Sequence, residues 1–89
     1  MKRFELLDYE AIVSYNKQQH YPFKVILLNT RDSKEVFYGE HVTVDQLCFS
    51  VHREMLLHDY HAYNPMQTLY AVERLRDGLD LWLDKLGVC

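Results

Sequence analysis

Glycine, proline and cysteine are scarce in this chain, and each scarcity excludes a class of structure. The 89 residues include 3 Gly, 2 Pro and 2 Cys. With so few Gly and Pro and no low-complexity run, no segment has the composition of a disordered tail or a flexible linker. Two cysteines, Cys48 and Cys89, do not make a disulfide framework, which favours a cytoplasmic location over a secreted one.

Long apolar runs and glycine-rich loops are missing as well. No stretch approaches the ~20 apolar residues of a membrane span. Glu5, Asp8 and Glu10 interrupt the start of the chain, where a secretory signal would require an apolar run. The three glycines lie far apart, so they cannot form a phosphate-binding loop. The sequence therefore predicts no membrane segment and no nucleotide site of that kind.

An excess of positive charge is absent too. The formal net charge is −3 with neutral His, which argues against binding to nucleic acid or to an acidic membrane mainly through charge. Protonation of all 5 His would change the charge from −3 to +2, so the surface charge is sensitive to mild acid. We expect no nucleic-acid partner and no membrane partner.

The composition that remains is that of a small globular domain, with 48% hydrophobic and 26% charged residues. We expect a single compact domain over residues 1–89, close to the lower size limit at which one hydrophobic core is sufficient. Because association adds stability to a small fold, a homodimer formed through the C-terminal helix is one expectation.

The first part of the chain predicts a short helix and a hairpin. Asp8 is a suitable N-cap for a helix over residues 9–19, with Leu7 and Ile12 spaced as a hydrophobic staple. A brief edge strand over residues 1–7 is the alternative for the start of the chain. Residues 23–28 and 35–38 have the β-branched and aromatic content of strands, and the polar residues between them favour a turn.

The second part predicts two longer helices. Thr43 and Gln46 have the spacing of a capping box, and Val42 and Leu47 that of a staple. The helix that follows carries a core-facing stripe, made of Val44, Leu47, Cys48, Val51 and Met55.

Asn64 before Pro65 predicts the start of the last helix, over residues 65–86, and Gly87 predicts its end. Its predicted seam is Val72, Leu75, Leu79, Trp82 and Leu86, with Leu81 outside it. The predicted fold class is therefore α+β: a short N-terminal helix and an antiparallel hairpin, or a three-stranded sheet, packed by two longer C-terminal helices.

Few residues suggest catalysis or metal binding. Cys48 and His52 are four apart on one helix face, but His58 is rotated by about 120° from them, so with His61 they make a poorly phased zinc set. No serine or cysteine lies in a strand-to-helix elbow. The acids of the last helix have the spacing of a solvated face, at Asp77, Asp80 and Asp84. We expect no enzyme, no metal and no cofactor.

The joint between the two helices is the most distinctive segment. It interleaves aromatic and polar residues, which is typical of an exposed loop, and Tyr offers a large contact area at low entropic cost. We therefore predict a partner-binding surface at Asp59, Tyr60, His61 and Tyr63, with the exposed Leu81 side of the last helix as the next candidate.

The function predicted from these features is non-enzymatic protein binding. By analogy of size and composition alone, the best model is a small inhibitor or adaptor of the phage-encoded inhibitor or immunity-protein type, which occupies a larger cytosolic protein. The alternative is a homo-oligomer that senses or sequesters a small molecule between its subunits. A metal-dependent or thiol enzyme is the third class.

Overall fold

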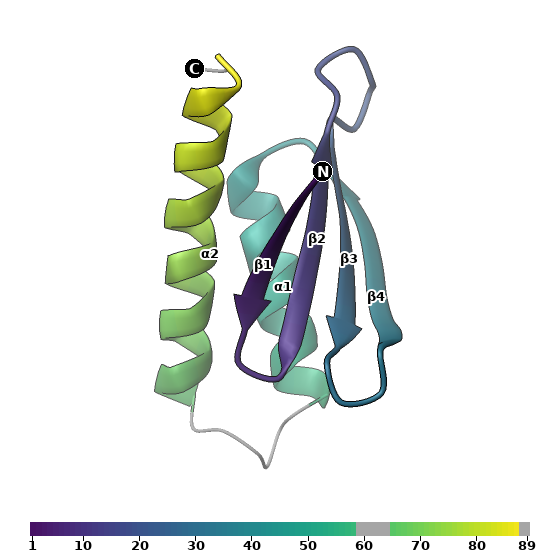
Figure 1. The fold of residues 1–89 in the computed structure, drawn as a ribbon, viewed down its shortest axis with the longest axis vertical. Helices are drawn as coiled ribbons and strands as arrows, with labels where there is room; N and C mark the ends of the chain where they lie inside the picture. The colour runs from purple at the N-terminus through teal and green to yellow at the C-terminus, as the bar shows by residue number, and fades with distance from the viewer. Residues whose placement is uncertain (59–64, 88–89) are drawn as a thin grey trace.

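The computed structural model describes residues 1–58 and 65–87 and has an α+β fold in which four strands precede two helices (Figure 1). The elements are β1 (Lys2–Leu6), β2 (Tyr9–Tyr15), β3 (Phe23–Asn29), β4 (Lys34–His41), α1 (Val44–His58) and α2 (Pro65–Lys85). The strands form one antiparallel sheet in the order β1-β2-β3-β4. Within these described residues no helix has the length and apolar content needed to cross a membrane.

The predicted helix over residues 9–19 is wrong, because most of this segment is strand β2. Its side chains alternate between buried and half-buried, with Tyr9, Ala11 and Val13 buried. This two-residue period fits a strand with one face on the core. The sheet consequently has four strands rather than the two or three that the sequence predicted, and the edge strand expected near the N-terminus is β1.

Asp8 lies in a turn rather than at a helix N-terminus. The turn between β1 and β2 has Leu7 at φ 60°, and a positive φ at the first central residue is a feature of the tight turns that join antiparallel strands. The Asp8 carbonyl accepts hydrogen bonds from the Thr30 amide and the Thr30 hydroxyl, each at 2.9 Å. Asp8 thus links this turn to the β3–β4 turn.

The predicted hairpin is confirmed as β3 and β4, with β3 inside the sheet and β4 at its edge. Asn29 and Asp32 order the turn, since their side-chain oxygens accept from the amides of Arg31 at 2.9 Å and Lys34 at 3.0 Å. The pairing register shifts between Leu27 and Leu28, as at a β-bulge.

The two C-terminal helices begin where the sequence predicts. The Thr43 hydroxyl accepts from the Gln46 amide at 3.1 Å, while the Gln46 side chain accepts from the Val42 amide at 3.1 Å, one residue earlier than in a standard capping box. Pro65 is the first residue of α2, and Gly87 follows its end with φ 79°. The predicted cap Asn64 lies outside the described residues.

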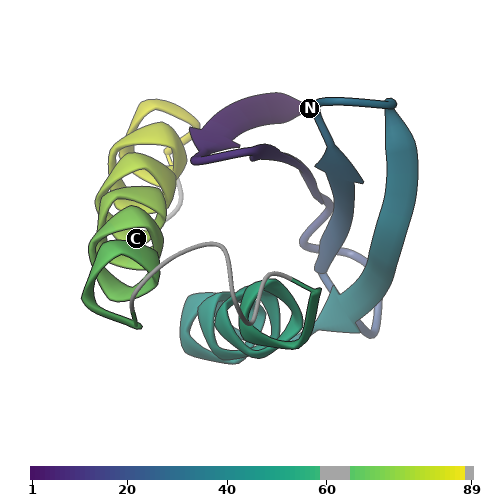
Figure 2. The ribbon, with the colours of Figure 1, turned by 90° about the horizontal axis from the view of Figure 1, so that it is seen from below.

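Both helices cover the same face of the sheet, and the opposite face has no helix of the described chain over it (Figure 2). The predicted stripe of α1 is confirmed, with Val44 half-buried and its other members buried. On α2 the predicted Val72, Leu75 and Leu79 are buried, but Leu86 is 52% exposed and Leu83 is buried instead. Leu86 lies one residue beyond the last residue of α2, Lys85, so it is outside the part of the helix that packs on the core.

Candidate interaction surface

Most of the predicted site residues cannot be placed. Asp59, Tyr60, His61 and Tyr63 lie outside the described residues, so the predicted surface at the joint stays a prediction. Leu81 is 63% exposed on α2, in agreement with its expected place off the buried seam. The described residues on either side of the joint therefore carry the structural evidence.

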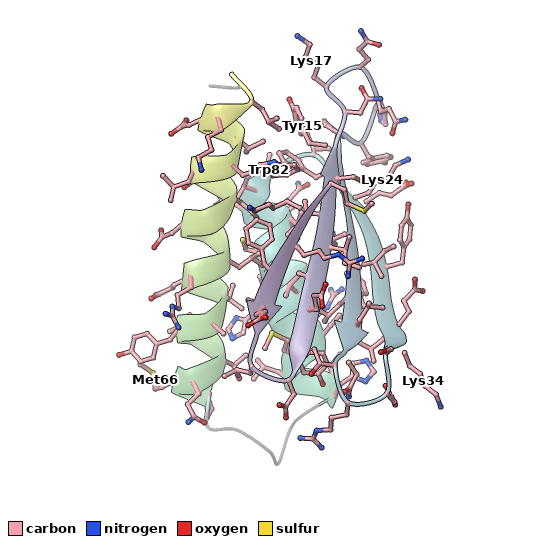
Figure 3. All side chains as sticks on the ribbon, viewed as in Figure 1. Tyr15, Lys17, Lys24, Lys34, Met66 and Trp82 are labelled. Atoms are coloured by element: carbon pink, nitrogen blue, oxygen red, sulfur yellow. The ribbon has the colours of Figure 1, made fainter. Side chains whose placement is uncertain are left out.

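Large apolar side chains are exposed at one end of the molecule. α1 ends there, α2 begins there, and the β1–β2 turn lies at the same end (Figure 1). Leu57 in the last turn of α1 is 67% exposed, and Tyr70 in the second turn of α2 is 58% exposed. Met66 is also exposed, and its side chain points away from the body of the protein (Figure 3).

The β1–β2 turn adds a further apolar residue to this end. Leu7 is exposed in the turn and lines a small depression together with Tyr70 and Arg74 of α2. We call Leu7, Leu57, Met66 and Tyr70 the joint-end surface. None of the four belongs to the buried core cluster.

A groove lies on the surface between α1 and α2. Its volume is about 860 Å³, and its walls come mainly from α1 and α2. Phe49 lines this groove and is 67% exposed. The Arg76 guanidinium of α2 donates to the Asp45 carboxylate of α1, so an ion pair joins the two helices beside the groove. The other lining residues are His41, Gln46, Cys48, Ser50, His52, Leu69, Val72 and Glu73.

His41 lies at the β4 side of this groove in an unusual environment. Its Nε2 atom is buried and has no hydrogen-bond partner within residues 1–58 and 65–87. A Cβ added at Gly39 would be 2.6 Å from this Nε2 and 2.7 Å from Cζ of Phe37, so glycine gives both rings the space to cover β4. Burial lowers the pKa of His41 below its ordinary 6.5, and the positive charge of Arg53 lowers it further.

The candidates for thiol and metal chemistry have no such support in the described residues. Cys48 is buried, as the sequence predicts, and this burial raises the pKa of its thiol to about 11, which keeps it protonated at neutral pH. No group of three or more His, Cys, Asp or Glu within residues 1–58 and 65–87 is arranged to hold a metal ion. His61, a member of the weighed zinc set, lies outside those ranges.

The sequence reasoning missed Phe49 and the groove beside it. A usable signal was present, because Phe49 is the one aromatic residue of its helix segment and falls outside the apolar stripe that faces the core. An aromatic side chain on the solvated side of an amphipathic helix marks a surface of interest.

Comparisons with known proteins add no relative from which a role could be inferred. No family model, no curated protein and no solved structure matches this chain.

Proposed function

We propose that this protein is a non-enzymatic binding module that occupies a larger protein through its joint-end surface. The observation that carries the proposal is the exposure of Leu7, Leu57, Met66 and Tyr70 at one end of the molecule. They adjoin the segment over residues 59–64, where the sequence predicts further aromatic contacts. Apolar and aromatic anchors of this kind concentrate binding energy at protein interfaces.

The chemistry of the remaining residues supports binding rather than catalysis. The buried Cys48 thiol has a pKa of about 11 and is unsuited to nucleophilic attack. The acidic residues Asp77, Asp80 and Asp84 are exposed along α2, as in an ordinary solvated face. A chain of 89 residues that acts by binding suits an inhibitor or adaptor of the phage-inhibitor or immunity-protein type, in which occupation of a partner is the whole activity.

Comparative capture from an extract of the native cell tests the proposal. The baits are the parent, a Leu57→Ser/Tyr70→Ser double variant and a Leu81→Ser variant, which removes an exposed leucine from another part of α2. We expect one dominant large protein with the parent and with Leu81→Ser, and its loss with the double variant. Each bait is checked for a native circular dichroism spectrum, and the captured protein is purified to confirm direct binding.

Two outcomes of the capture would move the binding surface elsewhere. Equal capture by the parent and by the double variant would contradict a role of the joint-end surface. Loss of capture with Leu81→Ser alone would favour the outer side of α2, which is the second surface that the sequence predicts.

The groove beside Phe49 favours a second candidate function, the binding of a small molecule. Its volume of about 860 Å³ falls in the range of ligand pockets, and Leu69 and Val72 provide apolar walls. A ligand-binding protein should be stabilised against heat by a small aromatic compound in the absence of any protein partner. Leu69→Gln should remove that stabilisation, whereas the joint-end double variant should keep it.

A further inference from the structure

One ridge of α1 carries an acid, an aromatic ring and a base in an evenly spaced row. Asp45, Phe49 and Arg53 are four residues apart, so their side chains follow one another along the same side of the helix. All three are exposed, with 77% of the Asp45 side chain and 53% of the Arg53 side chain accessible. Figure 2 shows the sheet and α2 next to α1 and no other described helix or strand on its outer side.

The order of charges along this row is complementary to that of a second copy of the row running in the opposite direction. A two-fold axis at Phe49 that packs two copies of α1 antiparallel places Asp45 of one chain opposite Arg53 of the other. Because a two-fold interface repeats every contact, two such acid–base pairs form. A parallel arrangement would place like charges opposite each other. The order of charges along α1 therefore favours the antiparallel one.

The apolar residues near the ends of the row match in the same arrangement. Val42 and Leu56 lie seven residues before and seven residues after Phe49, and both are exposed. The antiparallel packing thus brings an apolar residue toward an apolar residue at each end. At the centre, Phe49 of each copy packs against Phe49 of the other copy and against the groove beside that second Phe49.

The ion pairs already made within the chain are compatible with this packing. Asp45 accepts from Arg76, but a carboxylate has two oxygens and can accept from a second guanidinium. Arg53 approaches Glu54 at 3.5 Å, and because its own side chain is 53% exposed it can turn toward a second carboxylate at little cost.

We propose that this protein forms a symmetric homodimer through antiparallel packing of α1 about Phe49. The interface lies on α1 and not on the C-terminal helix, which is where the sequence suggested a dimer. The joint-end residues Leu57, Met66 and Tyr70 are outside the row, so the dimer presents two joint-end surfaces, one at each end of the α1 pair. A stable interface between two copies typically buries about 800 Å² on each subunit, which is a small part of the 5912 Å² surface of one chain.

Charge reversal tests the dimer by its mass in sedimentation and light scattering. The parent should have twice the 10.7 kDa of one chain. Asp45→Arg and Arg53→Asp should each be folded monomers, since each places like charges opposite each other. An equimolar mixture of the two variants should regain the dimer mass, because both pairs are then attractive, and the Asp45→Arg/Arg53→Asp double variant should dimerise alone. Asp77→Arg, on the exposed surface of α2, is the control and should leave the mass unchanged.

Disulfide trapping provides an independent test that does not depend on charge. In a Cys89→Ser background, Phe49→Cys should form a crosslinked dimer under mild oxidation, while Leu81→Cys should not. The proposal is overturned if the parent has the monomer mass at every concentration, if both single reversals stay dimeric, or if Leu81→Cys crosslinks in preference to Phe49→Cys. None of these measurements involves a larger partner, so a failure here is separate from a failure of the proposed binding function.

Discussion

The ring of Phe4 on β1 packs directly against the backbone of α2 at Gly78. A Cβ added at Gly78 would be 2.8 Å from Cε1 of Phe4 and 3.2 Å from Cδ1. Glycine in the middle of a helix is intrinsically unfavourable by about 1 kcal/mol relative to alanine. Glycine at position 78 therefore lowers the intrinsic stability of α2 but allows β1 to approach the helix closely.

This contact predicts a coupling between the two positions. Gly78→Ala alone should not stabilise the protein, because the methyl group collides with the Phe4 ring. In a Phe4→Ala background the same substitution should raise the free energy of unfolding by about 1 kcal/mol. A double-mutant cycle by urea denaturation measures the coupling, and equal effects of Gly78→Ala in the two backgrounds would show that the ring and the helix do not constrain each other.

The strained turn before β2 predicts a stabilising substitution. Leu7 has φ 60°, a conformation that costs an L-residue with a side chain roughly 1–2 kcal/mol and costs glycine little. Because Leu7 is exposed, Leu7→Gly loses little burial and should raise the unfolding free energy by about 1 kcal/mol. Ser33, at φ 58°, provides a matched second site, where Ser33→Gly should act in the same direction. A clear destabilisation by both changes would exclude the observed turn conformations.

The buried face of α2 predicts opposite outcomes for two leucines of the expected seam. Leu79 is fully buried, so Leu79→Ala should lower the unfolding free energy by about 2–5 kcal/mol. Leu86 is exposed, and Leu86→Ala should change it by less than about 0.5 kcal/mol. Similar large losses for both variants would restore the seam predicted from sequence and contradict the exposure of Leu86 beyond the end of α2.

The lowered pKa of His41 predicts that the free energy of unfolding decreases in mild acid. Its pKa in the folded protein is below the ordinary 6.5, so between the two values the unfolded chain binds more protons than the folded one. The contribution of His41 to stability is thus complete above pH 6.5 and is lost progressively as the pH falls below it. Urea denaturation between about pH 7.5 and pH 5 should show a smaller decrease for His41→Phe than for the parent. Identical slopes would mean that His41 titrates alike in both states.

Local signals in the sequence were sufficient for the second half of the chain. Thr43 and Gln46 form side-chain bonds that need only neighbouring residues, and Pro65 and Gly87 act through their own backbone preferences. The apolar stripe of α1 spans about three turns of one helix, so its period could be recognised without knowledge of any partner.

The helix predicted over residues 9–19 is wrong because helix and strand are both compatible with the local sequence there, and only tertiary context decides between them. Asp8, Leu7 and Ile12 have the spacing of a capped helix, while Tyr9, Ala11 and Val13 alternate as in a strand. The strand prevails because β2 pairs on both sides, with β1 and with β3, and these pairings are non-local. The groove beside Phe49 could not be predicted for a related reason, since a groove between two helices exists only after they have packed together.

The binding surface predicted at the joint is tested most directly by the affinity of the captured partner for a Tyr60→Ala/Tyr63→Ala variant. We predict that this variant keeps the unfolding free energy of the parent but loses about 2 kcal/mol or more of binding free energy, roughly a 30-fold loss of affinity. Both quantities are measured on the same preparations, by urea denaturation and by calorimetric titration. Parental affinity in the variant, or a loss of affinity accompanied by unfolding, would contradict the binding surface predicted at Tyr60 and Tyr63.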